Sequence, residues 1–77
     1  MTISDLKAGS FAQITQLDLL SPSAPRLLDL GFVPGTQVHV LSRAPLGEPI
    51  LIELRRHTLM LRKSEAQSVF VSVEEKK

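Results

Sequence analysis

The chain has 77 residues, of which 43% are apolar but only 4% aromatic, and it contains no Trp, Tyr or Cys. A chain this short forms one domain, residues 1–77, whose core must be built from Val, Ile and Leu. The missing cysteines exclude disulfides and thiolate metal sites. A net charge of +1 is too balanced for a protein that binds nucleic acid. No apolar run is long enough for membrane insertion and no secretory leader is recognisable, so we expect a cytoplasmic protein.

The first third of the chain predicts a strand and a short helix. The alternating pattern F-A-Q-I-T-Q-L indicates a strand over residues 11–17. A loop containing Ser-Pro follows, and a helix is predicted over residues 24–30, with Ser23 at its N-cap and Pro25 in its first turn. A helix of this length must be held in place by packing against the rest of the domain.

The stretch R-L-L-D-L-G-F-V-P-G-T predicts a helix end, a core anchor and a turn in close succession. Gly31 stands where helices commonly end in a left-handed residue. Phe32 follows as the expected core anchor. Pro34 and Gly35 suit the two central positions of a type II turn, because proline fixes a negative φ and glycine adopts the positive φ that follows. The chain is therefore expected to leave a helix and enter a strand here.

The second half of the chain alternates in the manner of strands. They are predicted over residues 37–44, 50–54, 58–62 and 69–73. A polar turn is expected at residues 55–57, a helical turn at 63–68 with Ser64 as its cap, and a charged tail at 74–77. Five short strands and one short helix predict a mainly β fold, a small SH3-like barrel whose sheet curls on itself to remove its edges.

Three segments together resemble the FeoA family of ferrous iron transport accessory proteins. They are the turn L-G-F-V-P-G-T, the hairpin loop A-P-L-G-E-P and the later run L-M-L-R-K-S-E-A. The same domain is similar to the C-terminal module of iron- and manganese-dependent repressors. In those proteins it follows a DNA-binding region that this sequence lacks, so we expect the stand-alone accessory form.

The resemblance implies a small cytoplasmic accessory or regulatory protein of ferrous iron uptake. It would bind the cytosolic portion of FeoB, the GTPase-linked ferrous iron permease, without being an enzyme and without a cofactor. The alternative is a divalent-metal-responsive regulatory domain that modulates GTP hydrolysis. Neither the direction of the effect on the permease nor the oligomeric state follows from the sequence.

The residues themselves offer little for catalysis or metal binding. His39 and His57 are 18 positions apart with no His-x-His or i, i+4 spacing, so we expect both to be solvated and no metal site. The serines and carboxylates stand outside recognisable nucleophile or acid–base motifs, which predicts no catalytic residue. Aromatic residues of the kind that line a polyproline groove or stack on bases are scarce.

The remaining functional signal on the predicted surface is partner binding. Leu19, Leu20 and Leu46 fall in loops, and exposed apolar residues mark a partner site when they are contiguous. Otherwise they cap the ends of the barrel. Arg55 and Arg56 either form a solvated hairpin face or a charged rim that docks on an acidic protein. We therefore predict a partner surface built from these five residues, provided that the two apolar loops lie close together.

Overall fold

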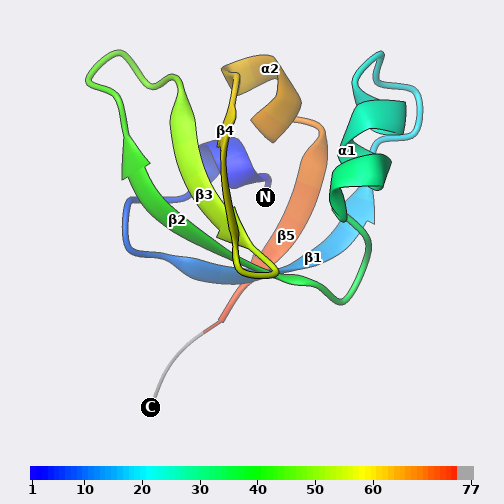
Figure 1. Ribbon diagram of the computed structural model, residues 1–77, viewed down its shortest axis with the longest axis horizontal. Coiled ribbons are helices and arrows are strands. Elements are labelled where there is room, and N and C mark those ends of the chain that lie inside the picture. The colour runs from blue at the N-terminus through cyan, green and yellow to red at the C-terminus, as the bar shows by residue number, and fades with distance from the viewer. Residues whose placement is uncertain (75–77) are drawn as a thin grey trace.

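The computed structural model describes residues 1–74. Within these residues the elements are, in chain order, η1 Ile3–Asp5, β1 Phe11–Leu17, α1 Ala24–Leu30, β2 Gln37–Arg43, β3 Ile50–Leu54, β4 His57–Leu61, α2 Lys63–Ala66 and β5 Val69–Val73. The strands form one antiparallel sheet in the order β4-β3-β2-β1-β5, which curls around the N-terminal turn η1 (Figure 1). The predicted mainly β class is confirmed. Of the expected tail at 74–77, only Glu74 belongs to the described residues.

Most element bounds agree with the sequence pattern, and the differences have local causes. The predicted turn at residues 55–57 contains only Arg55 and Arg56, because His57 already pairs with Leu54 and begins β4. The prediction that Ser64 caps α2 is wrong. Arg62 is the N-cap residue, and its backbone N–H donates to the carboxylate of Glu65 at 2.9 Å.

The core lies between the concave face of the sheet and the helices. Its members are the predicted inward residues of the strands together with side chains from η1 and α1. The fully buried larger ones are Phe32, Ile3, Ile14, Leu27, Ile50, Ile52, Leu54, Leu61, Val38, Val40 and Val69. Phe32 is the one aromatic residue among them, which confirms its predicted role as the anchor. A buried aromatic ring removes a large apolar area from water, so Phe32 is a major single contributor to this core.

Two bulges interrupt the alternation and redirect the side chains that follow. Between β1 and β5 the register shifts at Ile14/Gln16, so Thr15 is the extra residue and Leu17 returns to the core. Between β2 and β3 it shifts at Val40/Ser42. Such bulges bend the strand that carries them and increase its twist. They help to curl a sheet of only five strands.

Helix α1 ends before Gly31, as the sequence predicted. The N–H of Phe32 donates to the carbonyl of Leu27 at 3.0 Å, and the N–H of Gly31 donates to that of Leu28 at 3.0 Å. This is the pair of bonds of a Schellman motif. Gly31 has φ 104°, a left-handed conformation that a Cβ would strain. The motif places Phe32 in the core directly after the helix.

The following turn is also as predicted. The N–H of Thr36 donates to the carbonyl of Val33 at 3.2 Å, and Gly35 between them has φ 92°. Gly35 N–H donates to Ile14 O at 2.7 Å and Ile14 N–H donates to Thr36 O at 2.8 Å. These two bonds extend the β1–β2 pairing and dock the turn on β1.

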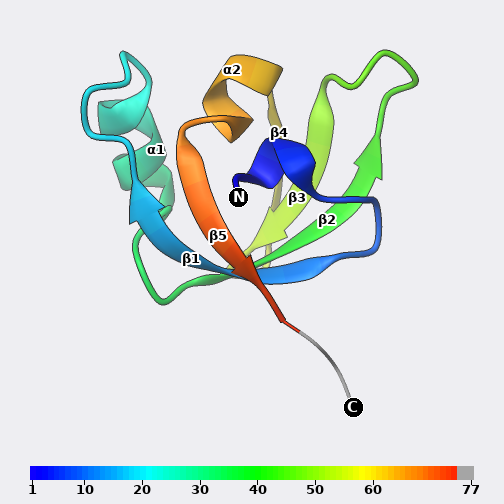
Figure 2. The same cartoon turned by 180° about the vertical axis from the view of Figure 1, so that it is seen from behind.

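The expectation that the sheet removes its own edges is wrong. Strands β4 and β5 are the two outer strands and do not pair with each other. Figure 1 has β4 nearest the viewer, whereas the reverse view in Figure 2 has β5 nearest. Helix α1 lies beside the gap between β4 and β5, which we call the seam. Its residues Ala24 and Leu27 are buried, and there is one hollow on each side of the helix. The apolar face of α1 fills the space that strand pairing would otherwise close.

Candidate partner-binding surfaces

The five residues predicted as a partner surface lie in three separate places. Leu19 and Leu20 are in the loop before α1, Leu46 is in the loop between β2 and β3, and Arg55 and Arg56 form the turn between β3 and β4. The first two loops lie at opposite sides of the molecule in both views (Figure 1, Figure 2). The condition that the two loops lie close together is therefore not met, and the five residues do not form one patch.

The structure instead gathers a different apolar surface, which we call the apolar groove. It is lined by Leu17, Leu19, Leu20, Leu28, Pro34 and Phe70, together with Gln16 and Asp18. Leu19 is 70% exposed and Leu20 94% exposed, while Leu28 of α1 and Phe70 of β5 are 41% and 37% exposed. The groove runs between α1 and β5, on the β5 side of the seam. Four large exposed apolar side chains that share one hollow are characteristic of a contact surface for another protein.

A tight turn holds the two leucines outward. The side-chain Oδ1 of Asp18 accepts from the N–H of Leu20 at 3.0 Å, and its backbone carbonyl accepts from the N–H of Ser21 at 3.1 Å. The N–H of Asp18 donates to the carbonyl of Ser68 at 2.8 Å. The loop is thereby tied to the start of β5, and its exposed leucines are presented by an ordered backbone.

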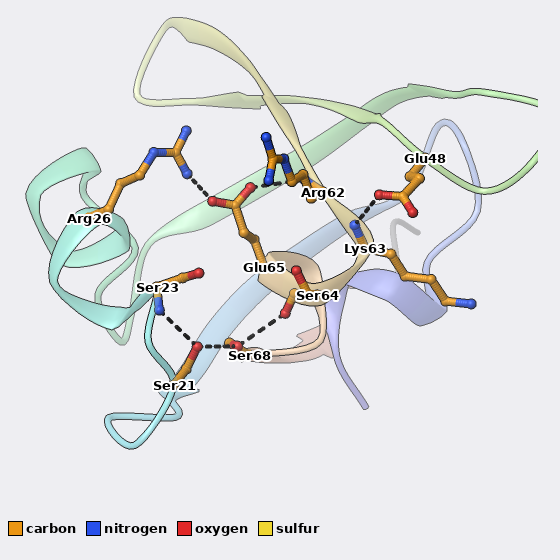
Figure 3. Close-up of polar contacts among 9 residues, drawn as sticks. All are labelled: Ser21, Ser23, Arg26, Glu48, Arg62, Lys63, Ser64, Glu65 and Ser68. Carbon is orange, nitrogen blue, oxygen red and sulfur yellow. Dashed lines mark hydrogen bonds and ion pairs between the residues drawn. The ribbon is translucent and has the colours of Figure 1, made fainter.

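Hydrogen bonds of serine hydroxyls also hold the loop between β1 and α1 (Figure 3). The hydroxyl of Ser68 lies 2.9 Å from Ser21 Oγ and 3.2 Å from the carbonyl oxygen of Ser64. Ser21 Oγ also accepts from the N–H of Ser23 at 3.2 Å. The predicted N-cap residue Ser23 makes no side-chain cap bond of its own. The start of α1 is therefore held by Ser21 and, through it, by α2.

An ion pair between Arg26 of α1 and Glu65 of α2 joins these two helices (Figure 3). The Glu65 side chain is 12% exposed and the Arg26 side chain 53% exposed. Glu65 accepts from the Arg26 guanidinium and from the backbone N–H of Arg62, so its buried carboxylate has two donors. A buried carboxylate needs such partners, and here they fix α1 relative to α2.

The Arg55-Arg56 turn has an unusual backbone. Arg55 has φ 49° and Arg56 has φ 69°, both left-handed. A two-residue hairpin of this type normally carries Asn-Gly or Asp-Gly. The Arg55 guanidinium donates to Thr36 Oγ1 at 3.3 Å. The turn therefore carries two exposed arginines at a cost in backbone strain.

The two histidines lie apart, and only His57 is exposed. His39 is half-buried, its ring stacked on Phe11 with a centroid distance of 3.9 Å, and its Nδ1 lies 3.8 Å from the carboxylate of Glu53. The expectation that His39 is fully solvated is therefore wrong. Within residues 1–74 there is no group of three or more His, Asp or Glu side chains that could hold a metal ion. In the same part of the chain, no helix has the length and apolar character needed to traverse a bilayer.

Of the four exposed apolar residues of the groove, Leu28 and Phe70 were not among the predicted site residues. Phe70 stands between Val69 and Val71, and strict alternation in V-F-V places it on the outer face once both valines are assigned to the core. Leu28 is about 100° around the helix from the buried Leu27 and is 41% exposed, at the side of the helix face that meets the core. Both signals were present in the sequence, but nothing in it indicates that these side chains meet Leu19 and Leu20.

The curled antiparallel sheet in the order β4-β3-β2-β1-β5, with its short helices, defines a small SH3-like domain. The profile of the FeoA domain matches residues 1–73, and the chain belongs to the FeoA family. It is 29% identical over 73 residues to an Fe(2+) transport protein A/Fe(2+) transporter FeoB fusion protein of Porphyromonas gingivalis. That match covers 95% of this chain but only 9% of the relative.

Solved FeoA structures share the fold. The solution structure of a FeoA-like protein from Clostridium acetobutylicum is 30% identical, with a TM-score of 0.92 over 100% of this chain and 90% of that one. The FeoA of Stenotrophomonas maltophilia, crystallised with zinc, is 34% identical, with a TM-score of 0.83 over 94% of this chain and 89% of that one. The latter is described as a prokaryotic SH3 domain protein that is a candidate activating factor of ferrous iron transport.

Proposed function

We propose that this protein is a non-enzymatic cytoplasmic accessory of ferrous iron uptake that binds the cytosolic portion of a FeoB-type permease. A relative that carries both proteins in one chain supports the pairing, because fusion keeps two partners at high effective concentration. The apolar groove is the observation that carries the proposal on this chain. It supplies the desolvated centre that a protein interface needs.

The chemistry of the groove fits a partner with an apolar projection. Leu20 is 94% exposed and Leu19 70% exposed, and the Asp18 turn and the Ser68 hydroxyl hold the loop that carries them. Because this backbone is already ordered, binding costs little loop entropy. Phe70 adds an aromatic wall, the residue class that is enriched at interface centres.

The test compares two leucines with the same exposure. Leu20 and Leu46 are each 94% exposed, but only Leu20 lines the apolar groove. Leu20→Glu should melt like the unmodified protein and raise the Kd for the purified cytosolic portion of FeoB by about thirtyfold, as a hot-spot loss of about 2 kcal/mol does. Leu46→Glu adds the same charge outside the groove and should bind normally.

Three outcomes discriminate among the surfaces. Weak binding by Leu20→Glu alone supports the groove. Weak binding by Leu46→Glu alone moves the contact to the loop between β2 and β3. Normal binding by both variants, each folded by its melting curve, removes the apolar groove as the partner site.

A further inference from the structure

The two edges of the sheet differ in what covers them. The outer edge of β5 is paired with the N-terminal residues, since Val71 N–H donates to Met1 O at 3.0 Å and Thr2 bridges to Phe70. Along the outer edge of β4, residues 1–74 supply no backbone partner. An exposed strand edge is a template for pairing with another chain.

The register of β4 identifies which groups are available. Leu54 pairs with His57 across a two-residue turn, and the pairing continues without a shift to Ile50 and Leu61. The pair that flanks such a turn exchanges hydrogen bonds, and bonded and non-bonded pairs then alternate. This alternation directs the backbone N–H and C=O of Thr58 and Met60 away from β3, to the outer edge.

Strand β4 lacks the usual protection of an edge. Residues 57–61 read H-T-L-M-L, with no proline or lysine, and the ladder to β3 contains no bulge. Natural edge strands are commonly blunted by these devices. The side chains of Thr58 and Met60 are exposed, so nothing on the strand itself blocks an approaching backbone.

Two separate hollows lie along this strand, and α1 contributes lining residues to each of them; together we call them the β4 groove. One hollow is lined by Asp29, Leu30, His57, Thr58 and Leu59, and a second is lined by Arg26, Pro49, Met60, Leu61, Arg62 and Glu65. Together they follow β4 for its whole length. Leu30 is 39% exposed and Leu59 is half-buried, so the floor near the turn is apolar. A strand laid in the groove would place alternate side chains against this floor.

The charges at the ends of β4 indicate which kind of segment could pair with this strand. Arg55 and Arg56 stand before the strand, and Arg62 and Lys63 follow it, all exposed. Three carboxylates lie beside these cations: Asp29 is exposed in the groove, Glu65 is paired with Arg26, and Glu48 accepts from the backbone N–H of Lys63 at 3.2 Å. Two copies of the chain paired antiparallel through β4 would bring the arginines of each turn against Arg62 and Lys63 of the other. Like charges would then face each other at both ends, which disfavours a second copy.

We propose that β4 accepts an extended segment of the FeoB cytosolic portion as a sixth strand of the sheet. The segment would have apolar residues at alternate positions and acidic residues at its ends. Its backbone would bond to Thr58 and Met60, an apolar side chain would contact Leu30 and Leu59, and its carboxylates would meet the cations at both ends of β4. This inference rests on the proposed function and adds a second contact to the apolar groove, on the other side of α1.

Hydrogen exchange and a proline variant test the inference with the full chain. The amides of Thr58 and Met60 should exchange at least about tenfold more slowly when the FeoB cytosolic portion is bound, because strand pairing protects them. Met60→Pro removes an outward N–H that makes no bond within the sheet, which edge strands tolerate. It should raise the Kd at least about tenfold, whereas Met60→Thr, which keeps the N–H, should bind within about twofold of the unmodified protein.

The outcomes separate this inference from the proposed function. If the unmodified protein does not bind the FeoB portion, both fail. If it binds but the Thr58 and Met60 amides exchange unchanged, strand addition is refuted while the proposed function stands. The exchange measurement decides the question even if Met60→Pro does not fold. A dimer in sedimentation that Met60→Pro dissolves would replace the FeoB segment by a second copy and would also overturn the inference.

Discussion

The turn between β3 and β4 gives a sharp test of the backbone argument. Arg56 has φ 69°, and a residue with a Cβ in this conformation carries about 1 to 2 kcal/mol of strain. Arg56→Gly relieves that strain but adds about 0.5 to 1 kcal/mol of conformational entropy to the unfolded chain. The net expectation is a gain of about 0.5 to 1 kcal/mol in the free energy of unfolding. For a domain of this size that corresponds to a melting temperature higher by about 4 °C.

A second substitution separates backbone strain from charge. Arg56→Ala removes the same positive charge but keeps a Cβ, so it should leave the strain in place and give no comparable gain. Arg55 is retained in both variants, and with it the bond to Thr36 Oγ1. Urea melts of the three proteins, fitted with a common slope, measure the differences.

The comparison of the two variants decides the interpretation. If Arg56→Gly is no more stable than Arg56→Ala, then the turn is not strained in the way that its φ values indicate. If both variants gain equally, repulsion between the neighbouring arginines is the cause, and the gain should shrink at high salt.

Other predictions follow from the core, the helix end, the ion pair and the histidines. Phe32→Ala should lose about 3 to 5 kcal/mol, because the ring is fully buried; a urea midpoint equal to that of the unmodified protein would contradict this. Gly31→Ala should cost about 1 kcal/mol or more through its φ of 104°, measured in the same way. Glu65→Gln should cost roughly 0.5 to 1 kcal/mol in low salt, because Arg26 is half exposed and solvent screens the pair; a loss that persists in about 1 M salt would point to packing instead. Calorimetry should show no ferrous or zinc binding tighter than about 10 μM, and a one-to-one isotherm lost in His39→Ala would support the metal-responsive alternative.

Much of the local structure could be predicted from the sequence. The period-2 pattern located β1, β3 and β5, and glycine and proline marked the end of α1 and the turn after it. These signals are local because they depend on the conformational range of single residues and on the period of side chains along one element. All five predicted contact residues, Leu19, Leu20, Leu46, Arg55 and Arg56, are also exposed.

The arrangement of the surface depends on the tertiary structure alone. Periodicity assigns a side chain to the inner or outer face, but which outer side chains become neighbours depends on bulges, on sheet curvature and on the path of α1. The shift at Thr15 and the Asp18 turn bring Leu20 toward Phe70, which lies 50 positions later in the chain. The same curvature separates Leu46 from them.

What the sequence by itself determined is the set of strands and turns, the anchor Phe32 and membership of a recognisable family, since each rests on local conformational preference or on a quoted motif. The tertiary structure decided that β4 and β5 do not pair and that, within residues 1–74, backbone covers the outer edge of β5 but not that of β4. The physical reason is that edge protection is a relation between distant segments. Met1 and Thr2 lie against β5 because the curl of the sheet brings the N-terminus to that edge, and α1 is held beside β4 and β5 by the burial of Leu27 in the core.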